Sequence, residues 1–312
     1  MTALSKRRIL LPWPALLVAL GCGGAPPLAP PDAGATPQRV VVLAPAAAEM
    51  LAALGLDSRV VGIGEFGPWP GELDSLPVVG GYSSPNVERI LDLQTELLIT
   101  ADSQAGAASH RLLEKLGVHV LALDTSTHAG VFESLAEVGE VFGRPERAGR
   151  IAEQMRHRLT RLSARAEGVT RRRVLFVVGR DPLYVAGPGS HIDEMIAMAG
   201  GENVAHDALS PYQQVSLETV LERLPEVIID TSDNSAQAEL GRRAGPWGRW
   251  PFLPAVQNDR VYWVEPGKLV IPGIRLPEMT ELMGRLVHPE IYGDVEAAGS
   301  DDEATGRLDS GR

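Results

Sequence analysis

The sequence predicts an α/β protein of two lobes that are joined by one long helix, with a ligand cleft between the lobes. Three observations support this prediction: apolar strands alternate with amphipathic helices, one strand-containing unit occurs twice, and a long amphipathic segment lies between the two copies. Alternating strands and helices are typical of parallel sheets covered by helices. At 312 residues with a hydrophobic fraction of 44%, the chain is long enough for two packed lobes.

The repeated unit is a short amphipathic helix followed by an apolar strand. Residues 87–100 read VERILDLQTELLIT and residues 217–230 read LETVLERLPEVIID, so that Glu88 matches Glu218 at a distance of 130 residues. A repeat of one supersecondary unit at this distance predicts two similar lobes. The space between two such lobes is a common place for a ligand.

The first lobe is predicted over residues 39–144. Its expected strands cover residues 39–43, 59–63, 97–101 and 118–123, and its expected helices outside the repeat cover residues 47–54 and 105–116. Gly55 and Gly117 directly follow these two helices. Glycine is common at this position because it adopts the left-handed conformation that ends a helix.

Residues 145–168 are predicted to form the helix that connects the lobes. Apolar residues recur at helical spacing on one face of this segment, namely Ala148, Ile151, Ala152, Met155, Leu159 and Leu162. The opposite side carries arginines, namely Arg147, Arg150, Arg158, Arg161 and Arg165. Pro145 suits the first turn of a helix and Gly168 its end. A helix of this length spans roughly 35 Å, and its place between the repeat copies favours a connector over one more surface helix.

The second lobe is predicted over residues 169–292. Its expected strands outside the repeat cover residues 173–178, 184–186 and 260–264, and its expected helices cover residues 192–199 and 277–287. Ser190 suits the N-cap of the first of these helices. Gly200 and Gly201 suit its end.

Residues 1–22 are predicted to be a lipoprotein signal peptide. Three basic residues precede an apolar run over residues 9–20, and residues 19–22 read ALGC, which resembles a bacterial lipobox. Cys22 is the only cysteine of the chain. We therefore expect cleavage before Cys22 and lipidation of its thiol, with an ordinary signal peptide or a short membrane anchor as the alternatives.

The remaining terminal segments are predicted to be disordered. Residues 23–38 are rich in Gly, Pro and Ala and form the expected tether, and residues 293–312 form an expected acidic tail. Together with the leader, the tether places the lobes on the periplasmic or another extracytoplasmic face of a bacterial membrane, where the lipid anchors them.

The sequence offers little for catalysis. The net charge of −11 argues against a nucleic-acid partner, because phosphate binding needs a basic surface. Common hydrolase, zinc-protease and phosphate-loop motifs are missing, and the seven histidines lack metal-ligand spacing. The only thiol lies in the leader. We therefore predict no catalytic residue, no metal ligand and no cofactor.

Aromatic residues gather near the ends of predicted strands and in Gly/Pro-rich loops. They are Phe66, Trp69, Tyr82, Tyr184, Tyr212 and Trp263. In open α/β sheets the binding crevice lies at the carboxyl ends of the strands, so loop aromatics there can line it. As a set they predict a cleft for a large, partly apolar, ring-bearing ligand. The alternative is that each ring fills a local loop core.

Glu88 and Glu218 lie in the first turn of the helix in each repeat copy. Two carboxylates at equivalent positions are expected to contact basic residues of a two-fold symmetric partner and to orient it. The alternative is a purely local role, because the helix dipole alone favours an acidic residue in the first turn by up to about 1 kcal/mol.

Several segments together resemble the helical-backbone substrate-binding proteins of bacterial ABC importers. They are the leader, VVLAPAAAE (41–49), VGGYSSPNVERIL (79–91), AGGENV (199–204) and VSLETVL (215–221). Members of this family carry cobalamin, ferric siderophores or heme. The resemblance covers residues 39–290, and the segments DPLYVAGPGS (181–190) and SPYQQVS (210–216) are most similar to the vitamin B12-binding members.

The resemblance implies two Rossmann-like lobes joined by a backbone helix. It also implies a non-enzymatic protein that delivers its ligand to a permease dimer with ATPase subunits, and that Glu88 and Glu218 contact arginines of this permease. The ligand would be a metal chelate, with cobalamin or a related corrinoid as the leading hypothesis. The aromatic residues that hold the ligand in the family match Phe66, Tyr82, Tyr184 and Tyr212.

Three positions depart from the best-known cobalamin binders. Ala101 stands in place of a tryptophan, and Gly267 and Ile271 stand in place of polar contacts. A ferric siderophore is therefore an alternative ligand. Heme is disfavoured, because Gly81 stands where a heme-coordinating tyrosine is expected.

Two alternatives come from other functional classes. An enzyme on the same scaffold, such as a metal chelatase or a nitrogenase-like reductase, would need Cys or His clusters that the mature chain lacks. A zinc or manganese receptor would need His110, His119 and His128 to converge on one point in the cleft.

Overall fold

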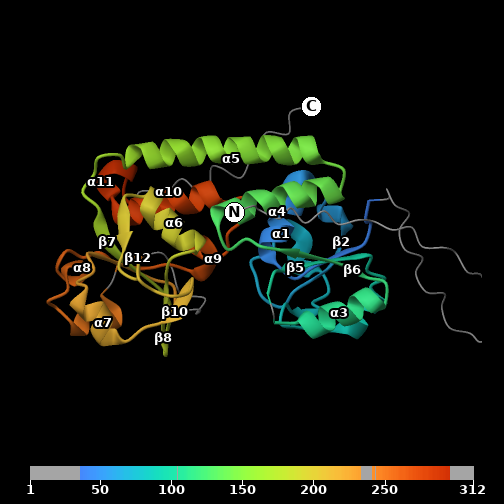
Figure 1. Ribbon diagram of the computed structural model, residues 1–312, viewed down its shortest axis with the longest axis horizontal. Helices are drawn as coiled ribbons and strands as arrows, with labels where there is room; N and C mark the ends of the chain where they lie inside the picture. Colours follow the sequence, from blue (N-terminus) through green and yellow to red (C-terminus); the bar gives the residue numbers. More distant parts are fainter. Residues whose placement is uncertain (1–35, 104, 233–240, 243, 296–312) are drawn as a thin grey trace, which may run out of the picture.

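The computed structural model describes residues 36–103, 105–232, 241–242 and 244–295. Two lobes lie side by side beneath one long helix, which runs across both of them (Figure 1). The signal peptide with Cys22, the tether up to residue 35 and the tail from residue 296 lie outside the described residues. Within the described part, no helix is long and apolar enough to cross a membrane.

The first lobe is built on a parallel sheet with the strand order β2-β1-β5-β6. Its strands are β1 Val40–Val42, β2 Val60–Ile63, β5 Leu97–Ala101 and β6 His119–Leu123, and a separate hairpin is formed by β3 Gly80–Gly81 and β4 Ser84–Pro85. Its α-helices are α1 Pro45–Leu54, α2 Val87–Asp92, α3 Ala107–Lys115 and α4 His128–Val141. Gly55 ends α1 with a φ of 71°, as predicted from the sequence.

Helix α4 is the main element that the sequence analysis does not predict. The side chain of Thr127 caps it by accepting a hydrogen bond from the N–H of Gly130 at 3.1 Å. Val131, Leu135 and Val138 form its buried face. This helix packs against the connecting helix, so it contributes to the layer that covers both lobes.

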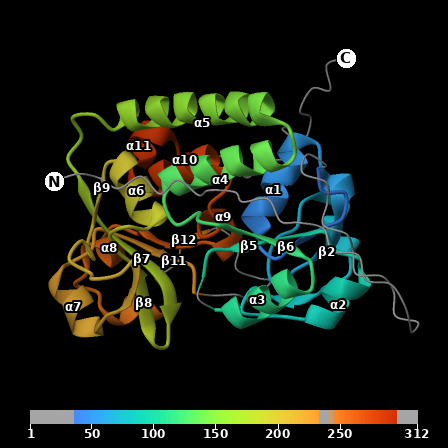
Figure 2. The same ribbon diagram turned by 45° about the vertical axis from the view of Figure 1, so that its right-hand side comes forward.

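The connecting helix, α5, covers Pro145–Arg165 and therefore ends three residues before Gly168. Five of the apolar residues that the sequence places on one face are buried, namely Ala148, Ala152, Met155, Leu159 and Leu162, and Ile151 is half-buried. These side chains pack against α4 of the first lobe and against helices of the second lobe. Figure 2 shows α5 along one side of the molecule, above both sheets.

The second lobe is built on a mixed sheet with the strand order β10-β8-β7-β11-β13-β12, in which β9 also pairs with β7. Strands β7, β9, β11 and β13 run parallel, whereas β8, β10 and β12 run antiparallel to their neighbours. The strands are β7 Arg172–Arg180, β8 Leu183–Ala186, β9 Gly201–Asn203, β10 Tyr212–Gln214, β11 Val227–Asp230, β12 Gly241–Arg242 and β13 Val261–Trp263. The α-helices are α6 His191–Met198, α7 Leu217–Glu222, α8 Pro254–Gln257, α9 Pro266–Leu269, α10 Leu276–Val287 and α11 Pro289–Tyr292.

One hydrophobic core extends through both lobes. A single cluster of buried side chains includes Val42 and Met50 of the first lobe, Leu159 of α5, and Met195 and Met283 of the second lobe. Burial of apolar surface stabilises each of these contacts by roughly 25 cal/mol per Å². The lobes are therefore packed together as one body along the side that α5 covers.

The two repeat copies also share their local contacts. Each helix is followed by a residue with positive φ, Gln94 at 51° and Leu224 at 47°. In the first lobe, Nε of Arg39 donates to the carbonyl oxygen of Leu93 at 2.8 Å. In the second lobe, Nε of Arg173 donates to the carbonyl oxygen of Leu224 at 3.0 Å. The acceptors of these two side chains differ by one repeat position, but the N–H groups of the equivalent Glu96 and Glu226 donate to the carbonyl oxygens of Arg39 and Arg173 at 2.9 and 2.8 Å. The two copies therefore share backbone geometry and this backbone hydrogen bond.

Candidate functional site

Four aromatic side chains that the sequence assigns to the ligand are exposed to solvent. Phe66, Tyr82, Tyr184 and Tyr212 have between 39% and 66% of their surface accessible. Among the aromatic side chains that the structure describes, Phe252 is the only other one with comparable exposure. Aromatic rings without a protein partner are candidates for contact with a ligand or another molecule.

Phe66 and Tyr82 lie near each other in the first lobe, because Phe66 packs on Gly81, the residue before Tyr82. Phe66 follows β2, and Tyr82 lies at the tip of the β3–β4 hairpin. The ring of Phe66 lies over the buried Gly81, because a Cβ atom at this glycine would be 3.5 Å from Cε2 of Phe66. Gly106, with a φ of 81°, lies against the carbonyl oxygen of Tyr82, where a side chain would clash.

Tyr184 and Tyr212 form a second pair in the second lobe. The antiparallel pairing of β8 and β10 places Tyr184 opposite Gln214 and Tyr212 opposite Ala186. The two tyrosines are therefore diagonal neighbours on one face of the ribbon. The surrounding protein raises the pKa of Tyr212 to about 12, although 41% of this residue remains exposed. A tyrosine hydroxyl is protonated at neutral pH even without this shift, so Tyr212 is able to donate a hydrogen bond.

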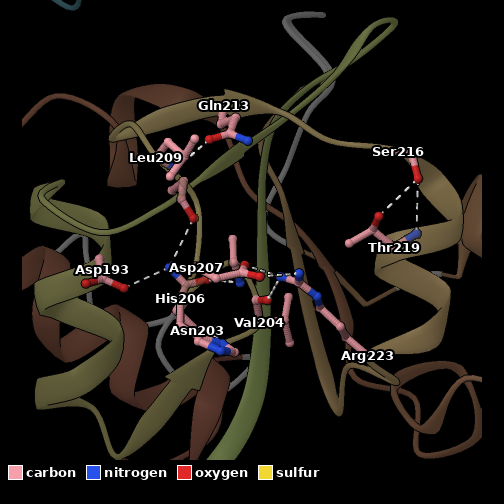
Figure 3. Close-up of polar contacts among 12 residues, drawn as sticks. Asp193, Asn203, Val204, His206, Asp207, Leu209, Gln213, Ser216, Thr219 and Arg223 are labelled. Atoms are coloured by element: carbon pink, nitrogen blue, oxygen red, sulfur yellow. Dashed lines mark hydrogen bonds and ion pairs between the residues drawn. The ribbon is translucent and has the colours of Figure 1, made fainter.

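The segment that carries Tyr212 is held by side-chain hydrogen bonds (Figure 3). Asn203 donates from Nδ2 to Asp193 at 2.8 Å, and its Oδ1 accepts from the N–H of Ala205 at 2.9 Å. Oε1 of Gln213 accepts from the N–H of Leu209 at 2.6 Å. These contacts fix the chain between β9 and β10.

A bidentate ion pair joins the same segment to helix α7. Both terminal nitrogens of Arg223 lie 2.8 Å from the carboxylate oxygens of Asp207, and Arg223 also donates to the carbonyl oxygen of Val204 (Figure 3). The hydrogen bonds from Arg223 hold the pKa of Asp207 below its usual range. A cavity of about 240 Å³ lies between the segment and α7, with Ser216 and Thr219 among its lining residues. The ion pair therefore couples the position of Tyr212 to that of α7.

Glu88 and Glu218 are the second residues of α2 and α7 and are exposed. The side chains of Asn86 and Ser216 cap these helices by accepting a backbone hydrogen bond from the third residue beyond, at 3.0 and 3.2 Å. Hydrogen bonds from its own N–H and from Ser216 hold the pKa of Glu218 below its usual range. Within the described part, neither glutamate has an ion-pair partner. Helices α2 and α7 lie on the side of the molecule opposite α5 (Figures 1 and 2).

A polar cluster between the lobes was not predicted from the sequence. The N–H of His191 donates to the carbonyl oxygen of Ser126 at 2.7 Å, and the N–H of His128 donates to the carboxylate of Glu194 at 2.7 Å. Burial lowers the pKa of His191 to about 4. These residues are far apart in the sequence and form no motif, so only the tertiary structure brings them together.

Comparison with known proteins identifies the family. A family model described as periplasmic binding protein matches residues 40–266. The chain belongs to the periplasmic binding protein family. This membership confirms, at the level of family and fold, the resemblance found in the sequence.

Among relatives of this periplasmic binding protein, the vitamin B12-binding protein of Vibrio parahaemolyticus is 29% identical over 226 residues, which are 72% of the chain and 80% of the relative. The Bacillus subtilis ABC transporter substrate-binding lipoprotein YvrC, itself uncharacterized, is 27% identical over 263 residues, 82% of each chain. The crystal structure of the periplasmic vitamin B12 binding protein BtuF of Vibrio cholerae superposes with a TM-score of 0.69 at 26% identity, covering 80% and 96% of the two chains. The heme binding protein HutB of Vibrio cholerae has a TM-score of 0.71 at 22% identity and shares the fold.

Two aromatic residues of this periplasmic binding protein do not join the exposed set, contrary to expectation. Trp263 is buried, and the guanidinium of Arg180 lies 4.6 Å from its ring centroid. Trp69 is half-buried and packs against the main hydrophobic core. For these two residues the alternative of a local core role is correct.

The three histidines required for a zinc or manganese receptor do not converge in the described residues. His110 is buried at the start of α3, His119 is exposed, and His128 pairs with Glu194. Across the described part of the periplasmic binding protein, no group of three or more potential ligands from His, Cys, Asp and Glu is placed to hold a metal ion. This alternative therefore has no support in the structure.

Proposed function

We propose that this periplasmic binding protein is the extracytoplasmic substrate-binding component of an ABC importer, and that its ligand is cobalamin or a related corrinoid. The observation that carries the proposal is the presence of two exposed aromatic pairs, Phe66 with Tyr82 in one lobe and Tyr184 with Tyr212 in the other. Rigid aromatic faces bind large, partly apolar rings at a low cost in conformational entropy. The relatives named vitamin B12-binding protein support the same ligand class.

A metal chelate suits this chain better than a free metal ion. In a chelate the organic ligand already occupies coordination positions, so the protein needs to supply contact surface and orienting hydrogen bonds. The protonated hydroxyl of Tyr212 is one group that supplies such a hydrogen bond. Binding of this kind requires no chemical step, and we therefore propose a transport protein and not an enzyme.

A ferric siderophore is the second candidate ligand. Three residues alter the contacts expected for a corrinoid. Ala101, at the end of β5, replaces an expected tryptophan, and Gly267 and Ile271 replace residues expected to make polar contacts. Heme is less well supported, because Gly81 is buried under the ring of Phe66 and offers no side chain for iron. A direct binding measurement is therefore needed to identify the ligand.

We further propose that Glu88 and Glu218 contact basic residues on a two-fold symmetric permease dimer with its ATPase subunits, and that a lipid on Cys22 anchors the protein to the membrane. The two glutamates occupy equivalent positions of a repeat whose two copies share the N-cap hydrogen bond and the positive φ after the helix. Their exposure leaves both carboxylates accessible to a partner. Charges of this kind at a rim contribute mainly to orientation and association rate.

Isothermal titration calorimetry of the mature protein tests the ligand assignment. Cyanocobalamin, one hydroxamate and one catecholate ferric siderophore, and hemin are titrated separately into the same preparation. We expect binding of cyanocobalamin with a stoichiometry of one and no heat of binding from the others. Binding of a siderophore alone would move the assignment to the second candidate, and absence of binding by all four would reject both.

A further inference from the structure

One side of α5 carries a row of arginines. Five arginines and the neutral Gln154 follow one another along α5 at intervals of three or four residues. This spacing places them in one line along the helix. The row extends for about 27 Å at 1.5 Å per residue. All its arginines are exposed, and we call them the arginine row: Arg147, Arg150, Arg158, Arg161 and Arg165.

Most of the arginine row lacks acidic partners. Arg158 pairs with Glu278 and, at 3.8 Å, with Glu281 of α10. Arg165 lies over the ring of Tyr292 at 5.8 Å. The other members, Arg147, Arg150 and Arg161, have no acidic partner among the residues that the structure describes. In a chain with a net charge of −11, this strip of positive charge calls for a functional explanation.

The acidic residues of α5 are Glu146 and Glu153, and in the part of the chain that the structure describes neither is ion-paired with a member of the arginine row. Glu153 pairs with Arg156 at 3.8 Å, and the guanidinium of Arg156 lies 4.6 Å from the ring centroid of Phe132 in α4. The other side of α5, towards α10, carries the arginine row. There, a cavity of about 240 Å³ is lined by Arg158, Arg161, Leu162, Arg165 and Glu281. Such a recess accommodates a group of the size of a phosphate.

The chain enters the fold at the end of α5 where the arginine row begins. A Cβ atom at Gly143, two residues before α5, would lie 3.7 Å from the side chain of Thr36. Arg59 holds this entry by donating to Oγ1 of Thr36 at 3.0 Å and to the carbonyl oxygen of Pro37 at 2.8 Å. Cys22 precedes Thr36 by 14 residues. A connection of that length reaches at most about 50 Å, so a lipid at Cys22 keeps α5 within reach of the membrane.

We propose that the arginine row binds anionic phospholipid headgroups, so that α5 lies along the membrane surface while the protein waits for its ligand. The inference rests on the lipid anchor of the proposed function. Guanidinium groups bind phosphate through paired hydrogen bonds. Because the chain as a whole carries a net charge of −11, an anionic membrane favours the orientation in which this strip of positive charge faces it. In this orientation α2 and α7, which carry Glu88 and Glu218, face away from the membrane (Figures 1 and 2).

Fluorescence quenching on vesicles tests the orientation. The mature protein is purified from bacterial membranes and reconstituted in phosphatidylcholine vesicles, with or without about one third phosphatidylglycerol. A fluorophore is attached through Q154C within the arginine row or through S83C beside Tyr82, and the quencher is carried by the lipid headgroups. We expect strong quenching of the Q154C label in anionic vesicles only, its loss at about 0.5 M NaCl, and little quenching of the S83C label.

Two double variants provide the decisive comparison. R150Q/R161Q removes two unpaired members of the row, and R111Q/R249Q removes two exposed, unpaired arginines outside it, with the same change in net charge. We expect the first variant to reduce quenching at Q154C about fivefold or more, and the second to leave it unchanged. Equal quenching in both lipids, or an equal effect of both variants, would overturn the proposal. Titration of cyanocobalamin into the same samples measures ligand binding. The fraction of each sample that is incorporated into vesicles measures whether the lipid anchor is present.

Discussion

The guanidinium of Arg275 lies 2.6 Å from the carboxylate of Glu49, and this ion pair joins the second lobe to the first. Glu49 belongs to α1 and is buried, whereas Arg275 directly precedes α10. Burial raises the pKa of Glu49, and the charge of Arg275 opposes this shift. Together with the continuous core, the pair ties the lobes to each other beside the region where we propose the ligand binds.

Removal of Arg275 alone is expected to destabilise the protein. R275M leaves the carboxylate of Glu49 buried without a partner, and we expect a loss of about 1–3 kcal/mol in the free energy of unfolding, since Arg275 itself is 38% exposed. The double variant E49M/R275M removes both charges and is expected to recover most of the loss. Urea unfolding of the wild type and of the variants, including E49M, measures these values. A double variant no more stable than R275M would contradict this account.

Stability is expected to fall as the pH is lowered from 7.5 to 5 because of His191. Burial lowers its pKa from 6.5 to about 4. The folded state therefore favours the neutral ring, and the stabilisation is complete above pH 6.5 and is lost as the pH falls towards 4. The expected loss at pH 5 is about 2 kcal/mol.

The variant H191Q isolates this contribution from those of the neighbouring His128 and Glu194. A glutamine keeps a donor for the carbonyl oxygen of Leu269, which lies 3.3 Å from Nε2 of His191. We expect urea unfolding at several pH values to show a smaller pH dependence for H191Q. The variant H157Q, which alters an exposed histidine of α5, serves as the control and should keep the full dependence.

Truncation of the exposed aromatic residues is expected to weaken ligand binding without affecting stability. Each of Y82A, Y184A and Y212A should raise the Kd for cyanocobalamin about 5- to 30-fold, because each removes an aromatic contact face. Their free energies of unfolding should stay within about 0.5 kcal/mol of the wild type, as is usual at exposed positions. F252A removes an exposed aromatic residue that is not assigned to the ligand, and it should leave the Kd unchanged. A similar effect of F252A would mean that exposure alone does not mark the site.

Neutralisation of both repeat glutamates is expected to impair uptake while sparing ligand binding. E88Q/E218Q removes the two carboxylates that we propose contact the permease, and uptake of labelled ligand by intact cells should fall about tenfold or more. The matched control is D92N/E222Q, which removes two exposed carboxylates at the last helical position of α2 and α7. Uptake at the wild-type rate by E88Q/E218Q would reject the docking role.

The carboxylates that close the repeat units are expected to contribute to stability. Glu96 accepts a hydrogen bond from the N–H of Gln38 at 2.7 Å, and Glu226 accepts one from the N–H of Arg173 at 3.0 Å. We expect E226A to cost about 1–2 kcal/mol and E96A about 1 kcal/mol in urea unfolding, since both bonds are charge-assisted but partly solvated. E202A, at an exposed position in β9, should have no measurable effect. Equal values for all three variants would show that the shared contacts are not stabilising.

Buried strands and capped helices were predictable from the sequence because their signals are local. Residues 97–101 are apolar except for Thr100, and β5 has these same bounds. Ser190 caps α6 by accepting a hydrogen bond from the N–H of Asp193, as its position before an apolar helix suggests. The repeat was visible for the same reason, because each copy combines a cap, a short helix and a buried strand.

Helix α4 escaped prediction because it contains two glycines, which weaken the local helical signal. The structure shows the tertiary reason for one of them. A Cβ atom at Gly139 would approach Cβ of Ala148 to 2.5 Å, so glycine permits α4 and α5 to pack closely. Close approach between two helices is a property of the fold and cannot be read from either segment alone.

The sequence indicated that aromatic residues form the candidate site, but it did not indicate which of them are exposed to solvent. Trp263 and Tyr212 belong to the same set of aromatic residues that the sequence predicts to line a cleft, yet the first is buried and the second is exposed. Tyr212 lies in the three-residue edge strand β10, whose polar sequence was expected to form a loop. The contacts between His191 and Ser126 join the two lobes, and nothing in either segment indicates the other.

The core that extends from β1 through α5 to α10 limits how such a protein can diversify by recombination. Each lobe has a smaller apolar cluster of its own, but the main core of neither lobe is complete by itself, because Met155 and Leu159 of the shared helix belong to it. A gene fragment for a single lobe is therefore a poor unit of exchange between relatives. New ligand preferences in this lineage should instead arise by substitution in the loops that carry Phe66, Tyr82 and Tyr212, whose changes leave the common interior untouched.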